Sequence, residues 1–245
     1  MEHYKITLAY DGSRYDGWQR QGNTDRTIQG KLERVLSRLD EQPVELRGAG
    51  RTDAGVHAKG QVADFRLEHS LSPSEVHEYL NHYLPEDIAV LSCESCDPRF
   101  HARLSATGKR YVYRIWNSEI PNVFERKFLT AWPQELDLEA MKQGAAHLVG
   151  TYDFKAFCAN KKFKKSSVRT IYSIDITRIG NEIRFTFEGD GFLYNMVRIL
   201  TGTLVEIGMG ERGANDISAI LASLDRTRAG RTMPPQGLIL DEVFY

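Results

Sequence analysis

Residues 3–10 read HYKITLAY, a stretch in which every second position from Tyr4 to Tyr10 carries a large apolar or aromatic side chain. Alternation with a period of two is typical of a half-buried β-strand. Further along, apolar residues recur at helical spacing over 27–39, which indicates an amphipathic helix. The chain therefore opens with a predicted strand and a helix that can pack on one face of a sheet.

The next part of the chain repeats this order. Short strand-like segments are expected at 44–46, 61–67 and 88–93. Between the last two, SPSE at 72–75 is a capping box with proline at the first helical position, so a helix is predicted up to Tyr83. The β-α-β…β-α-β order of this half predicts a ferredoxin-like α/β unit with its helices on one sheet face.

The second half begins with RFHARLSATG at 99–108, the expected crossover, and continues with KRYVYRIWN at 109–117, a strand with one basic edge. The remaining predicted elements are a helix from Leu138 to Leu148 that Asp137 caps and Gly150 ends, strands at 170–179 and 182–188, a nearly wholly apolar helix from Phe192 to Ile207, a helix from Asn215 to Leu224 and a strand at 238–245. We expect residues 1–105 and 106–245 to form two halves that are divergent copies of one α/β unit.

The composition is that of a globular protein. Of the 245 residues, 41% are hydrophobic and 27% are charged, and no apolar run approaches the length of a membrane span. The N-terminus enters a strand directly, without the basic and apolar regions of a signal peptide. We therefore expect a cytoplasmic protein with no membrane contact.

Cysteine and histidine spacing favours neither a disulfide framework nor a metal site. The three cysteines are few and odd in number, and CESC at 93–96 is followed by no second CxxC and no paired histidines. His77, Glu78 and His82 form HExxxH, one residue longer than a zincin motif. No metal is expected.

Charge is distributed unevenly along the chain, although the formal net charge is only −1. Residues 67–98 contain seven acids and no lysine or arginine, whereas residues 154–174 contain six bases and no acid. Residues 99–127 add seven bases against two acids. A near-neutral total can therefore hide a basic face that binds nucleic acid, the alternative being an ordinary solvated surface.

The segment GAGRTDAGVHA at 48–58 holds one acid, Asp53, in a run of small residues. Glycine allows backbone conformations that are closed to other residues and lets a ligand or another backbone approach closely. Such a run suits a tight turn that places the Asp53 carboxylate and the Arg51 guanidinium at the mouth of a cleft. The simpler interpretation is a glycine-rich turn in which Asp53 serves as a cap.

Two residues of the second half could act with such a carboxylate. Arg198 is the single charge in FLYNMVRILTG, and a buried guanidinium needs a carboxylate partner because desolvation of an unpaired ion is costly. The partner could be any nearby acid, or it could be Asp53, whose pKa the cation would lower by about 1–3 units and so keep it an ionised nucleophile. Tyr111 is either a core residue or a ring that stacks on a base, as aromatic side chains do in RNA recognition.

GAGRTDAGVHA resembles the signature of the tRNA pseudouridine synthase A family, whose members isomerise uridines 38, 39 and 40 in the tRNA anticodon stem-loop. Other stretches are similar in the same order: YDGSRYDGWQRQ at 10–21, FHARLSATGKRYVYRI at 100–115, GFLYNMVR at 191–198 and PQGLILDEVFY at 235–245. The similarity runs from residue 4 to the C-terminus, and the lysine-rich Lys161–Lys165 loop is the region that matches no motif.

The resemblance implies a role for each matched residue. Asp53 is similar to the catalytic nucleophile of the family and Arg198 to the arginine that pairs with it. Tyr111 resembles the tyrosine that stacks on the flipped uracil. Arg51 resembles the residue that takes the place of the displaced base in the stack, and Leu238 matches an apolar wall of the pocket.

The resemblance also implies a fold, partners and a type of chemistry. The fold is the α+β pseudouridine synthase fold, with two ferredoxin-like α/β halves joined in a mostly antiparallel sheet around a central catalytic cleft. The partners are the tRNA anticodon stem-loop and a second copy of the chain. We also expect the Arg99–Arg114 segment and Lys161–Arg169 to lie on the RNA side, with Arg103 and Lys109 binding the substrate. The reaction needs no cofactor and no metal, and small residues at 48–58 would let the sugar of a flipped nucleotide approach Asp53.

Two other functions are consistent with parts of the sequence. A non-catalytic RNA-binding or chaperone protein on the same scaffold would bind tRNA in a salt-dependent manner without changing it. A metal-dependent phosphohydrolase that uses Asp53 is disfavoured because no second acidic ligand lies near it in the sequence.

Overall fold

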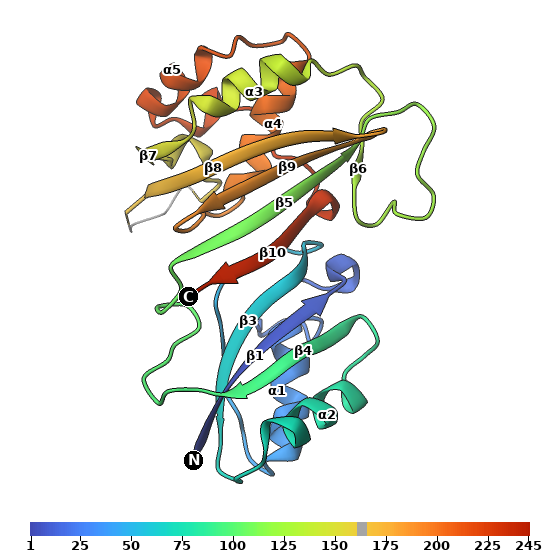
Figure 1. The fold of residues 1–245 in the computed structure, drawn as a ribbon, viewed down its shortest axis with the longest axis vertical. Coiled ribbons are helices and arrows are strands. Elements are labelled where there is room, and N and C mark those ends of the chain that lie inside the picture. The colour runs from blue at the N-terminus through green and yellow to red at the C-terminus, as the bar shows by residue number, and fades with distance from the viewer. Residues whose placement is uncertain (161–165) are drawn as a thin grey trace. The chain divides into compact units, whose positions relative to one another are not determined.

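The computed structural model describes residues 1–160 and 166–245, so the expectations for Lys161–Lys165 lie outside the described residues. The chain divides into two compact units, Met1–Thr107 together with Leu240–Tyr245, and Gly108–Ile239. Each unit combines a largely antiparallel sheet with helices (Figure 1), which confirms the predicted α+β class.

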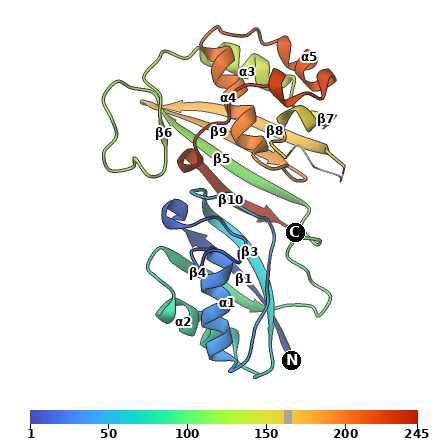
Figure 2. The same ribbon diagram turned by 180° about the vertical axis from the view of Figure 1, so that it is seen from behind.

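The first unit has strands in the order β4-β1-β3, with β2 also paired to β3 and all these pairs antiparallel. Its elements are β1 (Glu2–Tyr10), α1 (Ile28–Leu39), β2 (Leu46–Gly48), β3 (His57–Leu67), α2 (Pro73–Tyr83) and β4 (Ile88–Ser95). Figure 2 shows α1 lying over one face of this sheet. The predicted alternation of strands and helices in this half is confirmed.

The signals that predicted these elements act in the structure as expected. Tyr4, Ile6 and Leu8 of β1 are completely buried, because alternate positions of a strand point to one face. The Thr27 side chain accepts the N–H of Gly30 and begins α1, and SPSE at 72–75 forms a full capping box at the start of α2. Local capping therefore determines where the two helices of this half begin, and the alternation in β1 determines which face of the strand is buried.

Two strand boundaries around the 48–58 segment differ from the prediction. β2 begins at Leu46, later than expected. The N–H of Val44 donates to Ser37 Oγ of α1 (2.9 Å), so Val44 is bound to the helix and is not part of the strand. β3 begins at His57, earlier than expected, since Ala58 pairs with the end of β1. The end of the segment is therefore strand rather than turn.

The second unit has antiparallel strands in the order β5-β9-β8-β7, with β6 parallel to β5. Its elements are β5 (Gly108–Trp116), β6 (Thr130–Ala131), α3 (Leu138–Ala146), β7 (Gly150–Asp153), β8 (Val168–Ile179), β9 (Glu182–Gly189), α4 (Met196–Gly208), α5 (Asp216–Ser223) and β10 (Leu238–Phe244). Short 3₁₀ turns occupy Gly12–Arg14, Lys155–Phe157, Arg226–Arg228 and Pro235–Gly237. From Leu240 onward, β10 belongs to the first unit.

Helix α4 begins at Met196, and the prediction that it begins at Phe192 is wrong. Asn195 precedes the helix with a φ of 60°, in the left-handed region that a right-handed helix cannot include. Every residue of α4 except Arg198 is buried, which confirms the prediction that this largely apolar helix is buried.

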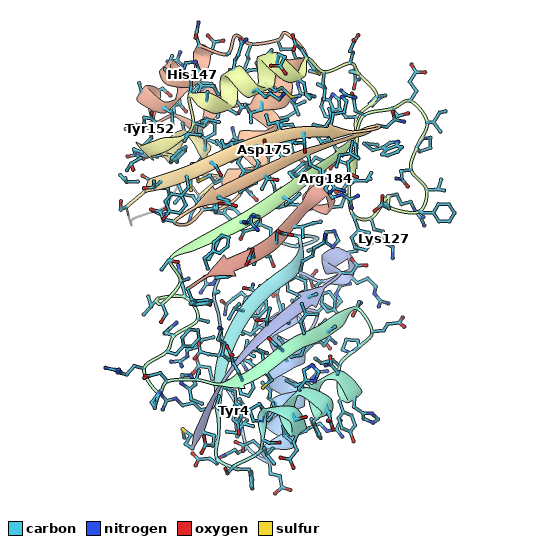
Figure 3. The ribbon with its side chains drawn as sticks, in the orientation of Figure 1. Tyr4, Lys127, His147, Tyr152, Asp175 and Arg184 are labelled. Atoms are coloured by element: carbon cyan, nitrogen blue, oxygen red, sulfur yellow. The ribbon has the colours of Figure 1, made fainter. Side chains whose placement is uncertain are left out.

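On the face of the second sheet that carries Arg184 (Figure 3), charged side chains of β5 and β9 form ion pairs. Arg110 Nε lies 2.6 Å from Glu188 Oε1, and Arg114 Nε lies 2.7 Å from Glu182 Oε1. Arg184 Nε also donates to the Glu182 carboxylate. The prediction that β5 has a basic edge is therefore wrong. The pairing with β9 brings a separate glutamate within reach of each β5 arginine, Glu188 for Arg110 and Glu182 for Arg114.

The Glu182 carboxylate is expected to make stability depend on pH. Its hydrogen bonds from the Arg114 guanidinium lower the Glu182 pKa from 4.5 to about 2. A lowered pKa in the folded state stabilises the fold above the unfolded-state pKa, and this contribution is lost as the pH falls through the folded-state value. The melting temperature of the wild type should therefore exceed that of Glu182→Gln by a constant margin at neutral pH, and the margin should narrow between about pH 4.5 and 2. An unchanged margin at about pH 3 would contradict this assignment.

Candidate active site

The 48–58 segment connects the end of β2 to the start of β3 in the first unit. Within it, Asp53 is half-buried and Arg51 is exposed, whereas Thr52 between them is buried. The turn therefore presents a carboxylate and a guanidinium on either side of an anchored residue.

Hydrogen bonds hold this turn from several directions. Thr52 Oγ1 lies 2.8 Å from Tyr10 Oη, and the Thr52 carbonyl accepts the N–H of Trp18 (3.0 Å). The Gln61 side chain donates to the Gly50 carbonyl (2.9 Å). Burial raises the pKa of Tyr10, so its hydroxyl stays neutral. The backbone that carries Asp53 is thus fixed before any ligand binds.

Close contacts explain two glycines around the turn. Gly17 has a φ of 95°, and a Cβ there would lie 2.8 Å from the Thr52 carbonyl oxygen. A Cβ at Gly48 would lie 2.5 Å from the ring of Trp18, which is itself only 2% exposed. At Gly48 the small residue therefore makes room for Trp18, and the expectation that it makes room for a nucleotide is wrong there.

A surface hollow of about 980 Å³ lies beside the turn. Ala54, the neighbour of Asp53, forms part of its wall together with residues of the loop between β1 and α1. The other lining residues are Asp16, Gln21, Gly22, Asn23, Thr24, Asp25 and Arg26. One side of the Asp53 turn thus borders a polar concave surface.

In the second unit, Arg198 is half-buried rather than buried as predicted. Its Nε donates to the Met233 carbonyl (2.6 Å), and its Nη1 donates to Asn195 Oδ1 (2.8 Å). The Arg198 carbonyl in turn accepts the N–H of Met233 (3.2 Å). Two neutral acceptors therefore fix the plane of the guanidinium. Asn195 was missed by the sequence reasoning, since nothing in YNMVR signals a left-handed asparagine.

Tyr111 lies on β5 with 8% of its surface exposed, and its ring meets Phe192 edge to face at 5.2 Å. Tyr113, on the same face of the strand, is completely buried and donates to the Pro234 carbonyl (2.7 Å). The packing is tight at this point, because a Cβ on Gly237 would lie 2.7 Å from the Tyr113 ring.

Leu238 follows directly and is 5% exposed. The 233–238 segment of this unit therefore contains the Met233 carbonyl that accepts from Arg198, the Pro234 carbonyl that accepts from Tyr113, and Leu238 itself.

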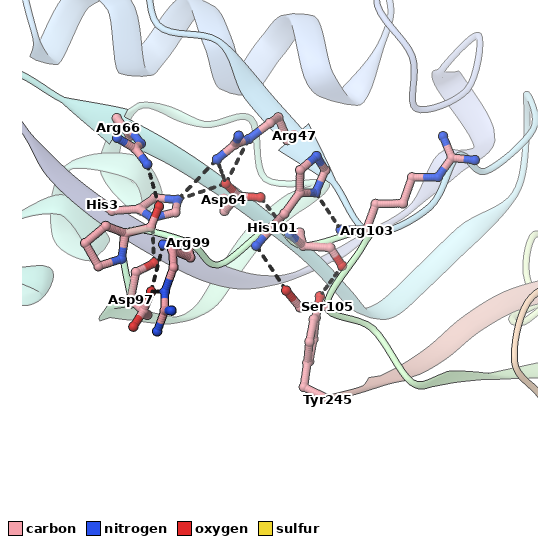
Figure 4. A network of polar contacts seen from close by, with 12 residues as sticks. His3, Arg47, Asp64, Arg66, Asp97, Arg99, His101, Arg103, Ser105 and Tyr245 are labelled. Carbon is pink, nitrogen blue, oxygen red and sulfur yellow. Dashed lines mark hydrogen bonds and ion pairs between the residues drawn. The ribbon is translucent and has the colours of Figure 1, made fainter.

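The two predicted substrate-binding cations differ in their surroundings. Arg103 is exposed in the loop Asp97–Ser105 of the first unit, and its side chain extends away from the polar network around it (Figure 4). Lys109 is half-buried near the start of β5 in the second unit. Arg103 is thus the more accessible of the two.

The described residues contain no group of three His, Cys, Asp or Glu side chains placed to hold a metal ion. Burial raises the pKa of Cys93 to about 12 and that of Cys96 to about 11, so both thiols stay protonated near neutral pH. Within 1–160 and 166–245, no helix has the length and apolar character needed to cross a bilayer.

Comparison with known proteins gives consistent results over both units. A sequence profile described as tRNA pseudouridine synthase matches residues 6–104 and 145–245. The chain is 44% identical over 245 residues, the whole of both chains, to tRNA pseudouridine synthase A 2 of Bacillus cereus (strain ZK / E33L). It is 46% identical over 230 residues, 94% of each chain, to tRNA pseudouridine synthase A of Bacillus sp. (strain KSM-64).

A relative from another genus, tRNA pseudouridine synthase A of Acetivibrio thermocellus, is 45% identical over 246 residues, which covers 100% of both chains. Among solved structures, 82% of this chain matches 45% of a chain in the crystal structure of a Cbf5-Nop10-Gar1 complex, with a TM-score of 0.40 and 13% identity. The full-length sequence matches confirm the resemblance found in the sequence motifs, and the chain belongs to the tRNA pseudouridine synthase family.

Proposed function

We propose that this protein isomerises uridine to pseudouridine in the anticodon stem-loop of tRNA, at positions 38, 39 and 40. The observation that carries the proposal is the Asp53 turn, whose backbone is anchored by Tyr10, Trp18 and Gln61 in a chain with full-length relatives named for this activity. A carboxylate on a backbone that is fixed before binding suits a nucleophile, because its position need not be reorganised during the reaction.

Each of the other site residues has a proposed role. Arg198, its plane set by Asn195 and Met233, pairs with the Asp53 carboxylate and keeps it ionised. Tyr111 stacks on the uracil. These residues come from the second unit, so we propose that residues 1–105 carry the catalytic turn and that residues 106–245 complete the cleft.

The substrate also needs residues that open the stem-loop. A target uridine inside a paired or stacked region must be extruded, at a cost of roughly a few kcal/mol. Arg51, exposed next to the anchored Thr52, fills the place of the extruded base. Leu238 forms an apolar wall of the base pocket, while Arg103 and Lys109 contact the RNA backbone.

The reaction breaks the N1–C1′ bond, rotates the uracil and joins C5 to C1′, after which C5 loses its proton and N1 carries one. No electrons are gained or lost overall, so the chemistry requires neither a cofactor nor a metal. Asp53 acts either by attack on C1′ of the ribose or by attack on the base or removal of the C2′ proton. All of these routes use the same ionised carboxylate.

We also propose a cytoplasmic homodimer that binds tRNA across both subunits. The support is that one 245-residue chain offers limited basic surface for a whole tRNA, given a net charge of −1. Size-exclusion chromatography with light scattering should give twice the chain mass, and the mass of a single chain would contradict the dimer.

The activity is tested with an unmodified tRNA transcript. After incubation with the protein, carbodiimide labelling and primer extension should reveal pseudouridine at positions 38–40 of transcripts that carry uridine there. Salt-dependent binding without any new pseudouridine would favour the non-catalytic RNA-binding alternative instead.

A further inference from the structure

The Asp97–Ser105 loop of the first unit is anchored by a polar network that none of the proposed catalytic steps uses (Figure 4). We propose that Asp64, at the centre of this network, is a positioning residue for tRNA binding. It holds the loop in the shape in which Arg103 meets an RNA phosphate. The inference rests on the proposed function only in taking tRNA as the partner.

Asp64 lies on β3 and is completely buried. Its Oδ2 accepts from Arg47 Nε (2.9 Å) and lies 2.9 Å from His3 Nε2, while its Oδ1 accepts the N–H of Ala102 (2.7 Å). A buried carboxylate is tolerated when donors surround it in this way. Three separate segments of the unit thus converge on one side chain, and one of them is the loop.

Further contacts fix the same loop at other points. His3 Nδ1 lies 2.9 Å from the Asp97 carbonyl oxygen, and Arg66 Nη2 donates to the Pro98 carbonyl (2.6 Å). The Tyr245 hydroxyl donates to the Ala102 carbonyl (2.8 Å). Ala102 is therefore held on both its N–H, by Asp64, and its carbonyl, so the backbone that leads into Arg103 is fixed.

The anchored loop presents cations to solvent. The Arg99 side chain is 92% exposed and lies 3.3 Å from Asp97 Oδ1, so part of its charge is already balanced. Arg103 is exposed, and among the described residues its guanidinium has no carboxylate partner. An exposed arginine on a rigid backbone suits phosphate, because its planar fork binds phosphate oxygens in a bidentate manner without first ordering the chain. The network thus presents Arg103 as a preformed phosphate contact.

The test is a double-mutant cycle read by tRNA affinity across a salt series. Arg103→Ala should weaken binding of an unmodified tRNA transcript about tenfold and lower the salt slope by about 0.9. Asp64→Asn should weaken binding about three- to tenfold with a similar loss of slope, because the misplaced Arg103 loses the same contact. In the Arg103→Ala background, Asp64→Asn should weaken binding further by less than about twofold.

Two further variants separate positioning from folding. Tyr245→Phe removes only the hydrogen bond from the Tyr245 hydroxyl to the Ala102 carbonyl and should cause a smaller loss of tRNA affinity than Asp64→Asn. It therefore provides the test if Asp64→Asn fails to fold. Asp40→Asn is the matched control, since Asp40 is also buried and accepts the N–H groups of Glu68 and His69. It should lower the melting temperature but leave the affinity and the salt slope unchanged.

Two results would overturn the inference. One is that Asp64→Asn weakens binding by the same factor with and without Arg103; the other is that folded Asp64→Asn or Tyr245→Phe binds tRNA like the wild type. With tRNA at saturation, the rate of pseudouridine formation should be the same for Asp64→Asn and the wild type. If the wild type binds tRNA but forms no pseudouridine, the proposed function fails while the affinity cycle still decides the role of Asp64.

Discussion

Asp53→Asn is expected to reduce pseudouridine formation to below about one thousandth of the wild-type rate while leaving tRNA affinity within about twofold. The amide has nearly the same shape as the carboxylate, so the anchored turn keeps its hydrogen bonds with Tyr10, Trp18 and Gln61. It is neither ionised nor nucleophilic, so every proposed covalent route stops. Single-turnover assays with excess enzyme, read by carbodiimide mapping, measure the effect.

Asp175→Asn is the matched control for this variant. Asp175 is exposed on β8 of the second unit, with its side chain on the same face as the ion-paired Arg184. The control should keep both activity and tRNA affinity. Substantial turnover by Asp53→Asn, with material that melts like the wild type, would exclude Asp53 as the nucleophile.

Arg198→Ala should lower the rate at saturating tRNA by about 10²- to 10³-fold. The reason is that the proposed pairing with Asp53 keeps that carboxylate ionised and oriented. The substitution also removes the hydrogen bonds that Arg198 donates to the Met233 carbonyl and to the Asn195 side chain. A loss of roughly 1–3 kcal/mol of stability is therefore expected. Melting temperature and single-turnover rate therefore have to be measured on the same preparation.

Asn195→Gly separates the orientation of Arg198 from its charge. Glycine adopts the left-handed conformation found at Asn195 without strain, so the start of α4 should be preserved. The variant removes the Oδ1 that accepts from Arg198 Nη1 and should lower the saturated rate about three- to tenfold. Its loss of stability should be smaller than that of Arg198→Ala, because the hydrogen bond from Arg198 Nε to the Met233 carbonyl is kept. An unchanged rate for Arg198→Ala would remove Arg198 from the mechanism, whereas an unchanged rate for Asn195→Gly alone would remove only its orienting role.

Local sequence signals predicted most of the fold. The alternation in β1, the Ser72–Glu75 capping box of α2 and the burial of α4 are each predicted from a few neighbouring residues, and all three are confirmed. The start of α4 was missed because Asn195 adopts a left-handed backbone conformation that the apolar pattern of 192–207 does not signal. Strand β7 was missed because GTYD at 150–153 is short and has no buried residue, so it carries no apolar alternation.

The surroundings of the candidate site were harder to predict than its residues. The motifs identified Asp53, Arg198 and Tyr111, whose roles stay predictions. The glutamate partner of Arg110 lies far away in the chain and comes within reach only through the β5–β9 pairing, which composition cannot reveal. In the same way, the sequence predicts space for a ligand at Gly48, whereas the Trp18 ring occupies that space.

The path of β10 has a consequence for synthesis on the ribosome. Residues Leu240–Tyr245 belong to the first unit, although the whole of Gly108–Ile239 is translated before them. They lie beside β3, where a Cβ on Gly60 would approach the Asp241 carbonyl to 2.4 Å, and the N–H of Thr107 donates to the Phe244 carbonyl. A nascent chain that ends before Leu240 therefore leaves the edge of β3 without this neighbour, and an uncovered edge strand invites pairing with other chains. The unit whose synthesis begins first is thus completed late, which makes its folding depend on contacts between residues far apart in the chain.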